Sequence, residues 1–489
     1  MLIELKQNNF RFTAEPSLVI PLFRNLPGAE YLRIIKGIME LSEKEVDEVF
    51  AVVVRSLPGR YRNITSLFET HFENISSFIK EAGADLESLS DSRKSLLGAA
   101  FTYDFPVEAA GLFSPSVVFH PDQTELNSGE RRLIFMLRAI GPGHKSSLVF
   151  RSGVIDRNNQ FTPEPCGKLL SSGDVVFPET FSKERFVKKM HCLNGKYEDR
   201  LYDRLSMRLQ ETFTASQLKA ELEELADTHQ IPQGFFTEVE QALETSFELD
   251  FSIDVGLDEK IIYPFAETEK KGYKNPVLVR LDSPIDDPCY VATCIADSGS
   301  GLRYKLFTTS DFYYFEFSNL FLDDEQISHL AIFPVKFNGK YALLGSKHNG
   351  IYLAFSSDLN HWGDFVCIYE ARYAWELVKL SHSGAPLLTP EGWLVITQGT
   401  GPAGKTTLSA LLLDSENPAK MIAALNEPLL TSTHGDGLLQ FGQVSGGAIL
   451  HNNTLIIPFS ITRFNSTYAE ISLEVLMNHM VALPDLQQK

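Results

Sequence analysis

The stretch NGKYALLGSK, residues 338–347, places an Asn-Gly turn directly before a hydrophobic strand. Two later stretches repeat this arrangement, EGWLVITQG at residues 391–399 and NNTLIIPFS at residues 452–460. Turn residues followed by a run of β-branched and other apolar residues are typical of antiparallel hairpins. The stretches recur every 50–60 residues or so, a spacing that suits repeated four-stranded units. The pattern therefore predicts a small β-propeller.

Helical patterns lie on both sides of an earlier β-rich stretch, RRLIFMLRAI at residues 131–140. Before residue 112, apolar residues recur at helical spacing, and Ser42 with Glu45 forms a capping box before one predicted helix. Between residues 180 and 247 the apolar spacing is again helical, with charges of alternating sign. We therefore predict a mainly β protein, a five-bladed β-propeller with an N-terminal α-helical module and a helical insertion after the first blade.

These patterns divide the chain into four predicted segments. The helical module is expected at residues 1–108 and the first propeller segment at residues 109–180. The helical insertion is expected at residues 181–248, and the remaining blades at residues 249–489.

The composition limits the class of protein. The 489 residues include 44 Lys and Arg against 63 Asp and Glu, which gives a formal net charge of −19. That balance argues against a nucleic-acid partner, because phosphate binding draws on clustered basic residues. No apolar run reaches the roughly 20 residues of a membrane helix, and no secretory signal opens the chain. The five cysteines are scattered without metal-ligand spacing, so we expect a cytoplasmic protein without metal or cofactor.

One motif matches the phosphate loop of nucleotide-binding proteins, GTGPAGKT at residues 399–406. Such a loop needs a helix after it, whose first N–H groups hold the phosphates. The residues that follow, TTLSALLLDSEN, instead predict a strand and a turn, and only about eighty residues remain. Nucleotide binding is therefore a weak alternative to a loop between strands.

Several further stretches, in collinear order, carry a family resemblance. They are AAGLFSPSVVFHPDQ (109–123), LRAIGPGHKSSLVFRSGVID (137–156), YPFAETEKKGYKNPVLVRL (263–281), AIFPVKFNGKYALL (331–344), IYLAFSSDLNHW (351–362), GAPLLTPEGWLVITQGTGP (384–402), LLLDSENPAKMI (411–422) and GGAILHNNTLIIPF (446–459). In these stretches the chain resembles glycoside hydrolase family 130, the mannoside phosphorylases and β-1,2-mannosidases, and in particular the branch with an N-terminal helical module.

The resemblance implies a five-bladed propeller with a polar pocket at one mouth. Members of this family cleave β-mannosides with inversion, using phosphate or water. The Asp of a Glu-Asp-Ala/Pro-Arg motif acts as general acid, and its proton is relayed through a sugar hydroxyl. Inversion needs an acid on the leaving oxygen and a nucleophile on the opposite face.

The sequence departs from the family pattern at the positions that carry this chemistry. Asn275 stands at the general-acid position, and an amide does not release a proton as a carboxylic acid does. The family's cationic and pocket residues are also replaced, at Val277, Ser328, Val335, Gln398, Thr462 and Arg463. The new charges of Lys274 and Arg463 would suit an acidic ligand. No catalytic residue is therefore assigned.

The leading hypothesis is a divergent family member that binds an oligosaccharide or β-mannoside-like glycoside and lacks the family's phosphorolysis. The substrate-binding residues expected from the resemblance are Arg138, His144, Asn275, Asp297, Gln398 and Arg463. The alternative is an active β-mannosidase or glycosyl-transferring enzyme with a new acid, for which Asp297 and Asp436 are the nearest candidates. A homo-oligomer is expected by resemblance only.

Overall fold

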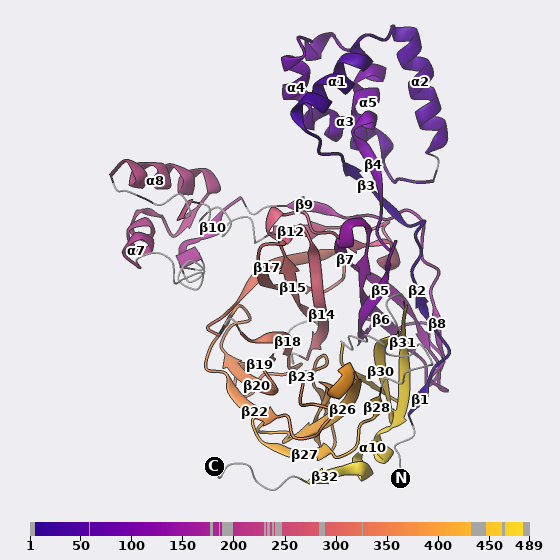
Figure 1. Ribbon diagram of the computed structural model, residues 1–489, viewed down its shortest axis with the longest axis vertical. Helices are drawn as coiled ribbons and strands as arrows, with labels where there is room; N and C mark the ends of the chain where they lie inside the picture. Colours follow the sequence, from indigo (N-terminus) through magenta and orange to yellow (C-terminus); the bar gives the residue numbers. More distant parts are fainter. Residues whose placement is uncertain are drawn as a thin grey trace.

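The computed structural model describes most of the chain (Figure 1). The described residues are 5–57, 59–176, 179–184, 186–187, 199–228, 231, 235–236, 239, 247–282, 289–324, 326–431, 446–461 and 465–482. Strands make up most of the body, and the prediction of a mainly β protein that also carries helices is confirmed.

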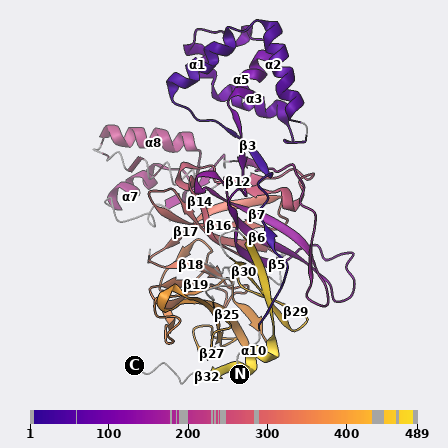
Figure 2. The ribbon, with the colours of Figure 1, turned by 45° about the vertical axis from the view of Figure 1, so that its right-hand side comes forward.

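A group of helices lies apart from the sheets, at the top of Figure 1, and stays separate from them in the turned view of Figure 2. The predicted capping box is present, because Ser42 and Glu45 each accept a hydrogen bond from the other's backbone N–H. A two-stranded sheet of β3 (Val19–Phe23) and β4 (Thr102–Pro106) joins the group to the body. The helices are α1 (Gly28–Met39), α2 (Glu43–Ser56), α3 (Ile64–Asn74), α4 (Ser76–Glu81) and α5 (Asp91–Ala100).

The described strands of the body fall into five successive, mainly antiparallel sets. The first set is β5 (Gly111–Phe119), β6 (Arg131–Ile140) and β7 (Ser146–Ile155), with β8 (Phe161–Pro163) and β13 (Ile261–Ile262) beside β7. The second is β14 (Gly272–Leu281), β15 (Cys289–Asp297), β16 (Leu302–Thr309) and β17 (Tyr314–Leu322), extended by β12 (Phe247–Asp250), β9 (Asp174–Val176) and β21 (His361–Trp362). A parallel contact between β7 and β14 joins these two sets.

The remaining three sets form separate sheets. The third is β18 (Ser328–Ile332), β19 (Tyr341–Lys347), β20 (Gly350–Ser356) and β22 (Val366–Glu370). The fourth is β23 (Lys379–His382), β24 (Leu387–Thr389), β25 (Gly392–Thr400), β26 (Thr406–Leu413), β27 (Met421–Leu425), β28 (Leu430–Thr431) and β32 (Met480–Ala482). The fifth is β29 (Ile449–His451), β30 (Thr454–Ile461) and β31 (Asn465–Ser472), joined by the N-terminal β1 (Lys6–Gln7) and β2 (Phe12–Thr13). The short helix α10 (Leu473–His479) follows β31.

The repeated turn-and-strand stretches form the second strand of their sets. Residues 338–347 contain β19, and the turn before it has positive φ at both Asn338 (49°) and Gly339 (79°). Two successive positive φ angles define the type I′ hairpin turn that an Asn-Gly pair favours. Likewise β25 and β30 occupy the other two stretches, and β6 occupies residues 131–140.

Apolar side chains fill the spaces between successive sets. Each pair of neighbouring sets shares a hydrophobic core, and the fifth set shares one with the first. Two members of each shared core, one from each set, are Met136 and Leu278, Val279 and Ile332, Phe333 and Trp393, Ile396 and Ile457, and Phe135 and Ile456.

The first strand is kinked in four of the sets, and in the fifth set the kink lies just before the first strand, β29. Register shifts interrupt β5, β14 and β18, whereas β23 and β24 are two pieces that both pair with β25. Each kink contains a residue with positive φ, a conformation that favours Gly, Asn, Asp or His. These residues are Ser114 (49°), Asn275 (48°), His329 (52°), Gly384 (76°) and, before β29, Gly447 (74°).

Two regions differ from, or extend, the predicted segments. The sequence predicts a helical module at residues 1–108, but β1 and β2 come first in the chain. They pair with β31 and so cover the edge of the last sheet. Within the predicted insertion, α7 (Asp199–Arg208) and α8 (Ala215–Thr228) accompany β10 (Phe181–Ser182) and β11 (Thr212–Phe213), beside the body in Figure 1. Across the described ranges, no helix is both long and apolar enough to cross a membrane.

Candidate functional site

Asn275 lies in the kink of β14. The register of β14 against β15 shifts between Lys274 and Val277, so Asn275 lies outside the regular ladder. Its side-chain Nδ2 is 3.4 Å from Nδ1 of His329, which occupies the kink of β18. Two neighbouring kinks therefore bring the amide at the predicted acid position against an imidazole.

The second contact of His329 is to the fourth set. Nζ of the exposed Lys379 is 3.5 Å from Nε2 of His329, and Nε2 of His382 donates a hydrogen bond to the His329 carbonyl oxygen. Burial, with the charge of Lys379 and the nearby His382 adding to it, lowers the pKa of His329 to about 3. Burial also lowers the pKa of His382 to about 4. Both imidazoles are therefore neutral at pH 7.

A carboxylate and two cations lie beside this group. Nζ of Lys274 is 2.6 Å from Oδ2 of Asp297, and the Gly299 N–H donates to Oδ1 at 2.7 Å. The hydrogen bond from Lys274 is the largest cause that lowers the pKa of Asp297. Arg138 is half-buried on β6. Burial lowers its pKa, and the negative charge of Asp297 acts in the opposite direction. We call Arg138, Lys274, Asn275, Asp297, His329, Lys379 and His382 the kink cluster.

Asp297 is a poor fit for a general acid. An acid has to carry a proton at the working pH, and enzymes achieve this by raising the pKa of a carboxyl group. Lys274 and the Gly299 N–H act in the opposite direction and keep Asp297 ionised. Asp436, the other candidate acid of the alternative hypothesis, lies outside the described residues.

The other predicted binding residues have different positions. Gln398 is half-buried on β25, directly opposite Ser381 and next to the residue that pairs with His382. His144 is exposed on the turn between β6 and β7, where its φ is 59°. Both positions lie outside the kink of β14 that holds Asn275. Arg463 lies outside the described residues.

The phosphate-loop look-alike is a hairpin turn. Residues 399–406 connect β25 to β26 through a single 3₁₀ turn at Pro402–Gly404, and the Gly401 N–H donates to the Lys405 carbonyl at 2.9 Å. The turn between β6 and β7 has the same form, with Gly141 bonded to Lys145 at 2.9 Å. Since a strand follows where a phosphate loop needs a helix, the nucleotide-binding alternative is not supported.

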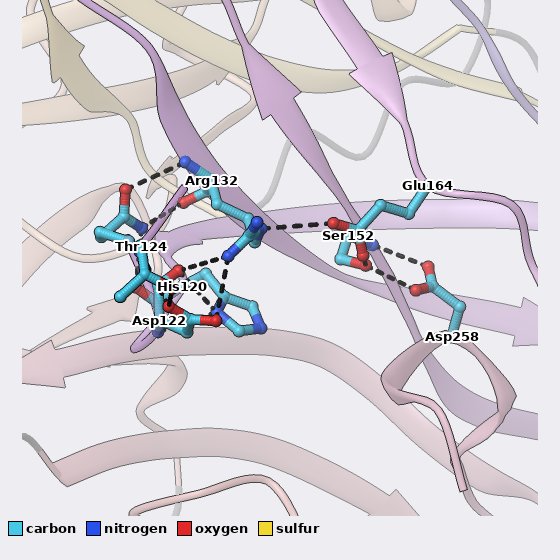
Figure 3. A network of polar contacts seen from close by, with 8 residues as sticks. His120, Asp122, Thr124, Arg132, Ser152, Glu164 and Asp258 are labelled. Atoms are coloured by element: carbon cyan, nitrogen blue, oxygen red, sulfur yellow. Dashed lines mark hydrogen bonds and ion pairs between the residues drawn. The ribbon is translucent and has the colours of Figure 1, made fainter. Parts of the chain in front are cut away.

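A carboxyl group with a raised pKa does occur, but in a different network (Figure 3). Burial raises the pKa of Asp258 to about 6. Asp258 and Glu164 both contact the hydroxyl of Ser152, at 2.6 and 2.7 Å, and Arg132 pairs with Glu164 at 3.3 Å. Arg132 and Arg138 are six positions apart on β6, about 20 Å along a strand. The network is therefore remote from the cluster end of β6.

Sequence reasoning missed His329, Lys379 and His382. A usable signal was present, because Lys274-Asn275-Pro276-Val277 and Ser328-His329-Leu330-Ala331 occupy equivalent kinks. Aligning the sets with one another would have placed His329 beside Asn275. In the described ranges, no group of three or more His, Cys, Asp and Glu side chains is arranged to hold a metal ion.

A cavity of about 740 Å³ lies elsewhere on the protein. It lies between β10 and β11 of the insertion and the outer strands β16 and β17, and its lining includes Phe181, Phe321, Asn319, Asp358 and His361. None of the kink-cluster residues line it.

Comparison with known proteins points to one group. A family described as β-1,4-mannooligosaccharide phosphorylase matches residues 258–444, which contain three of the five kinks. A 1,2-β-oligomannan phosphorylase from Thermoanaerobacter sp. (strain X514) is 30% identical over 213 residues, which are 42% of this chain and 69% of that protein. A β-1,2-mannobiose phosphorylase from Listeria innocua serovar 6a is 27% identical over 212 residues, 40% of this chain and 58% of its own length.

A solved structure is also similar. The β-1,2-mannobiose phosphorylase from Listeria innocua, in complex with β-1,2-mannobiose, aligns over 77% of this chain and 92% of that chain, with 18% identity and a TM-score of 0.45.

Proposed function

This chain belongs to glycoside hydrolase family 130, the mannoside phosphorylases and their hydrolytic relatives, and from that premise we propose that it binds a β-mannoside-like glycan without the family's phosphorolysis. The binding site in this proposal is the kink cluster, and Gln398 and His144 stay predicted binding residues beyond it; the predicted Arg463 lies outside the described residues. The relatives named above are described as phosphorylases of β-1,2- and β-1,4-linked mannosides, which makes such a glycan the first ligand to test.

The observation that carries the proposal is the environment of Asn275. The amide takes the place of the acid, and its neighbour His329 is neutral, with a pKa near 3. A group with that pKa holds almost no proton to donate at pH 7. Within the described residues of the kink cluster, the one carboxyl group is Asp297, which Lys274 keeps ionised. No member of the cluster is thus suited to protonate a leaving sugar oxygen.

The proposal includes a five-bladed propeller as the scaffold. Its support is the closed order of contacts among the sets. Ser116 of the first kink accepts a hydrogen bond from the Leu278 N–H of the second at 2.8 Å. The second and third kinks meet at Asn275 and His329, and the third and fourth at His329 and His382.

The last two kinks complete this order. The backbones of Gly384 and Gly447 approach so closely that a Cβ on Gly384 would lie 1.6 Å from the Gly447 nitrogen. Gly446 approaches the first set in the same way, since its Cβ would lie 1.8 Å from the Pro115 oxygen. Five sets whose first strands meet in a ring, with a shared core between each pair, are what a five-bladed propeller requires.

The test measures turnover and binding separately. The full-length protein is incubated with β-1,2-mannobiose and with β-1,4-mannobiose. Each reaction is run without phosphate and with phosphate in about 10-fold molar excess over the disaccharide. An active family relative is the positive control. We expect no steady release of mannose or mannose 1-phosphate, together with measurable glycan binding by isothermal titration calorimetry. Multiple turnovers in either reaction would refute the loss of catalysis, and absence of binding to every mannoside tested would refute the glycan site.

A further inference from the structure

The kink cluster contains more positive than negative charge. Lys274 and Arg138 both act on the single carboxylate of Asp297, whose second oxygen accepts the Gly299 N–H. One negative charge therefore faces two positive charges. The Lys274 side chain is 38% exposed, so its ammonium group remains within reach of a ligand.

Lys379 adds a third positive charge. The contact that the structure gives its exposed ammonium group is to Nε2 of His329, at 3.5 Å. That distance is too long for a strong hydrogen bond, and His329 is neutral at pH 7. Among the described residues, no carboxylate lies within ion-pair distance of Lys379. The cluster thus has a net charge of about +2, in a chain whose formal net charge is −19.

We propose that the kink cluster recognises the carboxylate of an acidic sugar, a uronic acid residue in a β-linked glycan, through Arg138, Lys274 and Lys379. The proposal rests on the proposed glycan site and specifies its ligand. A uronate carries one planar carboxylate, which a guanidinium group matches in shape and an ammonium group matches in charge. A neutral hexose would leave the charges of Lys379 and one of the other cations uncompensated.

Arg138 has the free bonding capacity that this role needs. Its Nε is buried on β6 and has no hydrogen-bond partner among the described residues. Buried donors of this kind normally find an acceptor, and a guanidinium group has five N–H bonds to satisfy. A ligand carboxylate beside Asp297 would provide one.

The experiment compares ligands that share one skeleton. Binding of β-1,4-linked di-mannuronate and of β-1,4-mannobiose to the full-length protein is measured by titration calorimetry, with inorganic phosphate and mannose 6-phosphate as further probes. We expect di-mannuronate to bind at least about tenfold more tightly than mannobiose, because one added hydrogen bond to a charged group contributes about that factor to the affinity. Raising NaCl from 50 to 500 mM should weaken di-mannuronate binding and leave mannobiose binding unchanged, because salt screens exposed charges.

The variants locate the preference in the cluster. Lys379→Met removes the charge and leaves a flexible side chain of similar size, and it should lower the affinity for di-mannuronate about tenfold more than the affinity for mannobiose. Lys420→Met, an exposed lysine on the turn between β26 and β27, is the matched control and should bind both ligands as the wild type does.

Each other outcome has a definite meaning. Equal affinities for the two disaccharides, unchanged by Lys379→Met, would overturn the uronate assignment and leave the glycan site standing. Binding of neither disaccharide would overturn both. Preferential binding of mannose 6-phosphate or of inorganic phosphate would overturn the carboxylate assignment in favour of a phosphate ligand.

Discussion

Replacing Asp258 by Asn should make the protein more stable at neutral and alkaline pH. Asp258 is 7% exposed, and its Oδ1 accepts the Ser152 N–H at 2.7 Å. The Ser152 hydroxyl lies within hydrogen-bond distance of both Asp258 and Glu164, yet it has one proton to donate. The second short contact therefore needs a proton on a carboxyl group, and the buried Asp258 is the better site for it.

The sign of the effect follows from this raised pKa. Burial raises the pKa of Asp258 from 3.8 to about 6 in the folded protein. The stabilising contribution of the protonated group is complete below pH 3.8 and is lost as the pH rises through 6. The difference, 6 − 3.8, is about 2 pH units, and at 1.36 kcal/mol per unit it corresponds to about 3 kcal/mol at pH 8.

Asparagine has the shape of the protonated acid and does not ionise. Its oxygen can accept the Ser152 N–H, and its NH₂ group can donate to the Ser152 hydroxyl, which then donates to Glu164. Every contact of the network in Figure 3 is thereby retained without a buried charge. We therefore expect Asp258→Asn to equal the wild type near pH 4 and to exceed it by up to about 3 kcal/mol at pH 8.

The assay is urea unfolding of both proteins from pH 4 to pH 8, followed by tryptophan fluorescence. The quantity of interest is the difference in free energy of unfolding, because other groups titrate equally in both proteins. Asp254→Asn is the matched control, since Asp254 is exposed and its pKa is lowered, chiefly by the hydrogen bond from Ser252 and further by Arg62. That variant should show no gain with rising pH. A difference between Asp258→Asn and wild type that stays constant across the range would refute the reasoning.

Two further predictions concern the kinks. Gly384→Ala should destabilise the protein by more than about 3 kcal/mol or prevent folding, because φ is +76° and the new Cβ would lie 1.6 Å from the Gly447 nitrogen; wild-type unfolding free energy would contradict this. Asn275→Asp should change the free energy of unfolding by less than about 0.5 kcal/mol and restore no turnover of β-1,2-mannobiose. The reason is that the N–H donors and positive charge around Lys274 and His329 would keep the new carboxyl group ionised. Multiple turnovers would show that the amide alone blocks catalysis.

The parts of the fold that local sequence encodes were predictable. The Asn338-Gly339 turn needs two positive φ angles, which those residues adopt readily, and the strand after it follows from its apolar run. The capping box of Ser42 and Glu45 involves residues three positions apart. The pairing of β1 with β31 was not predictable in this way, since Lys6 lies opposite Glu470 and no local pattern reports a contact over such a separation.

The candidate site was predictable only in part, for a related reason. Asn275 was found because a motif lies around it, whereas His329 and Lys379 lie in other sets and reach it through the kinks. The electrostatic character of the site depends on burial, which sequence does not give. The pKa of His329 near 3 and the ionised state of Asp297 are consequences of packing and of the partner Lys274.

The kinks separate what folding demands of Asn275 from what chemistry demands. With φ at 48°, the backbone favours Gly, Asn or Asp, so an aspartate would fit this position as well as asparagine does. The requirements of the fold therefore do not explain the absence of a carboxyl group here. Lys274 already pairs with Asp297, and His329 is neutral, so an aspartate at position 275 would add a second carboxylate that these neighbours keep ionised and unable to act as an acid. An amide, which donates as well as accepts, suits a site that holds a ligand better than one that protonates it.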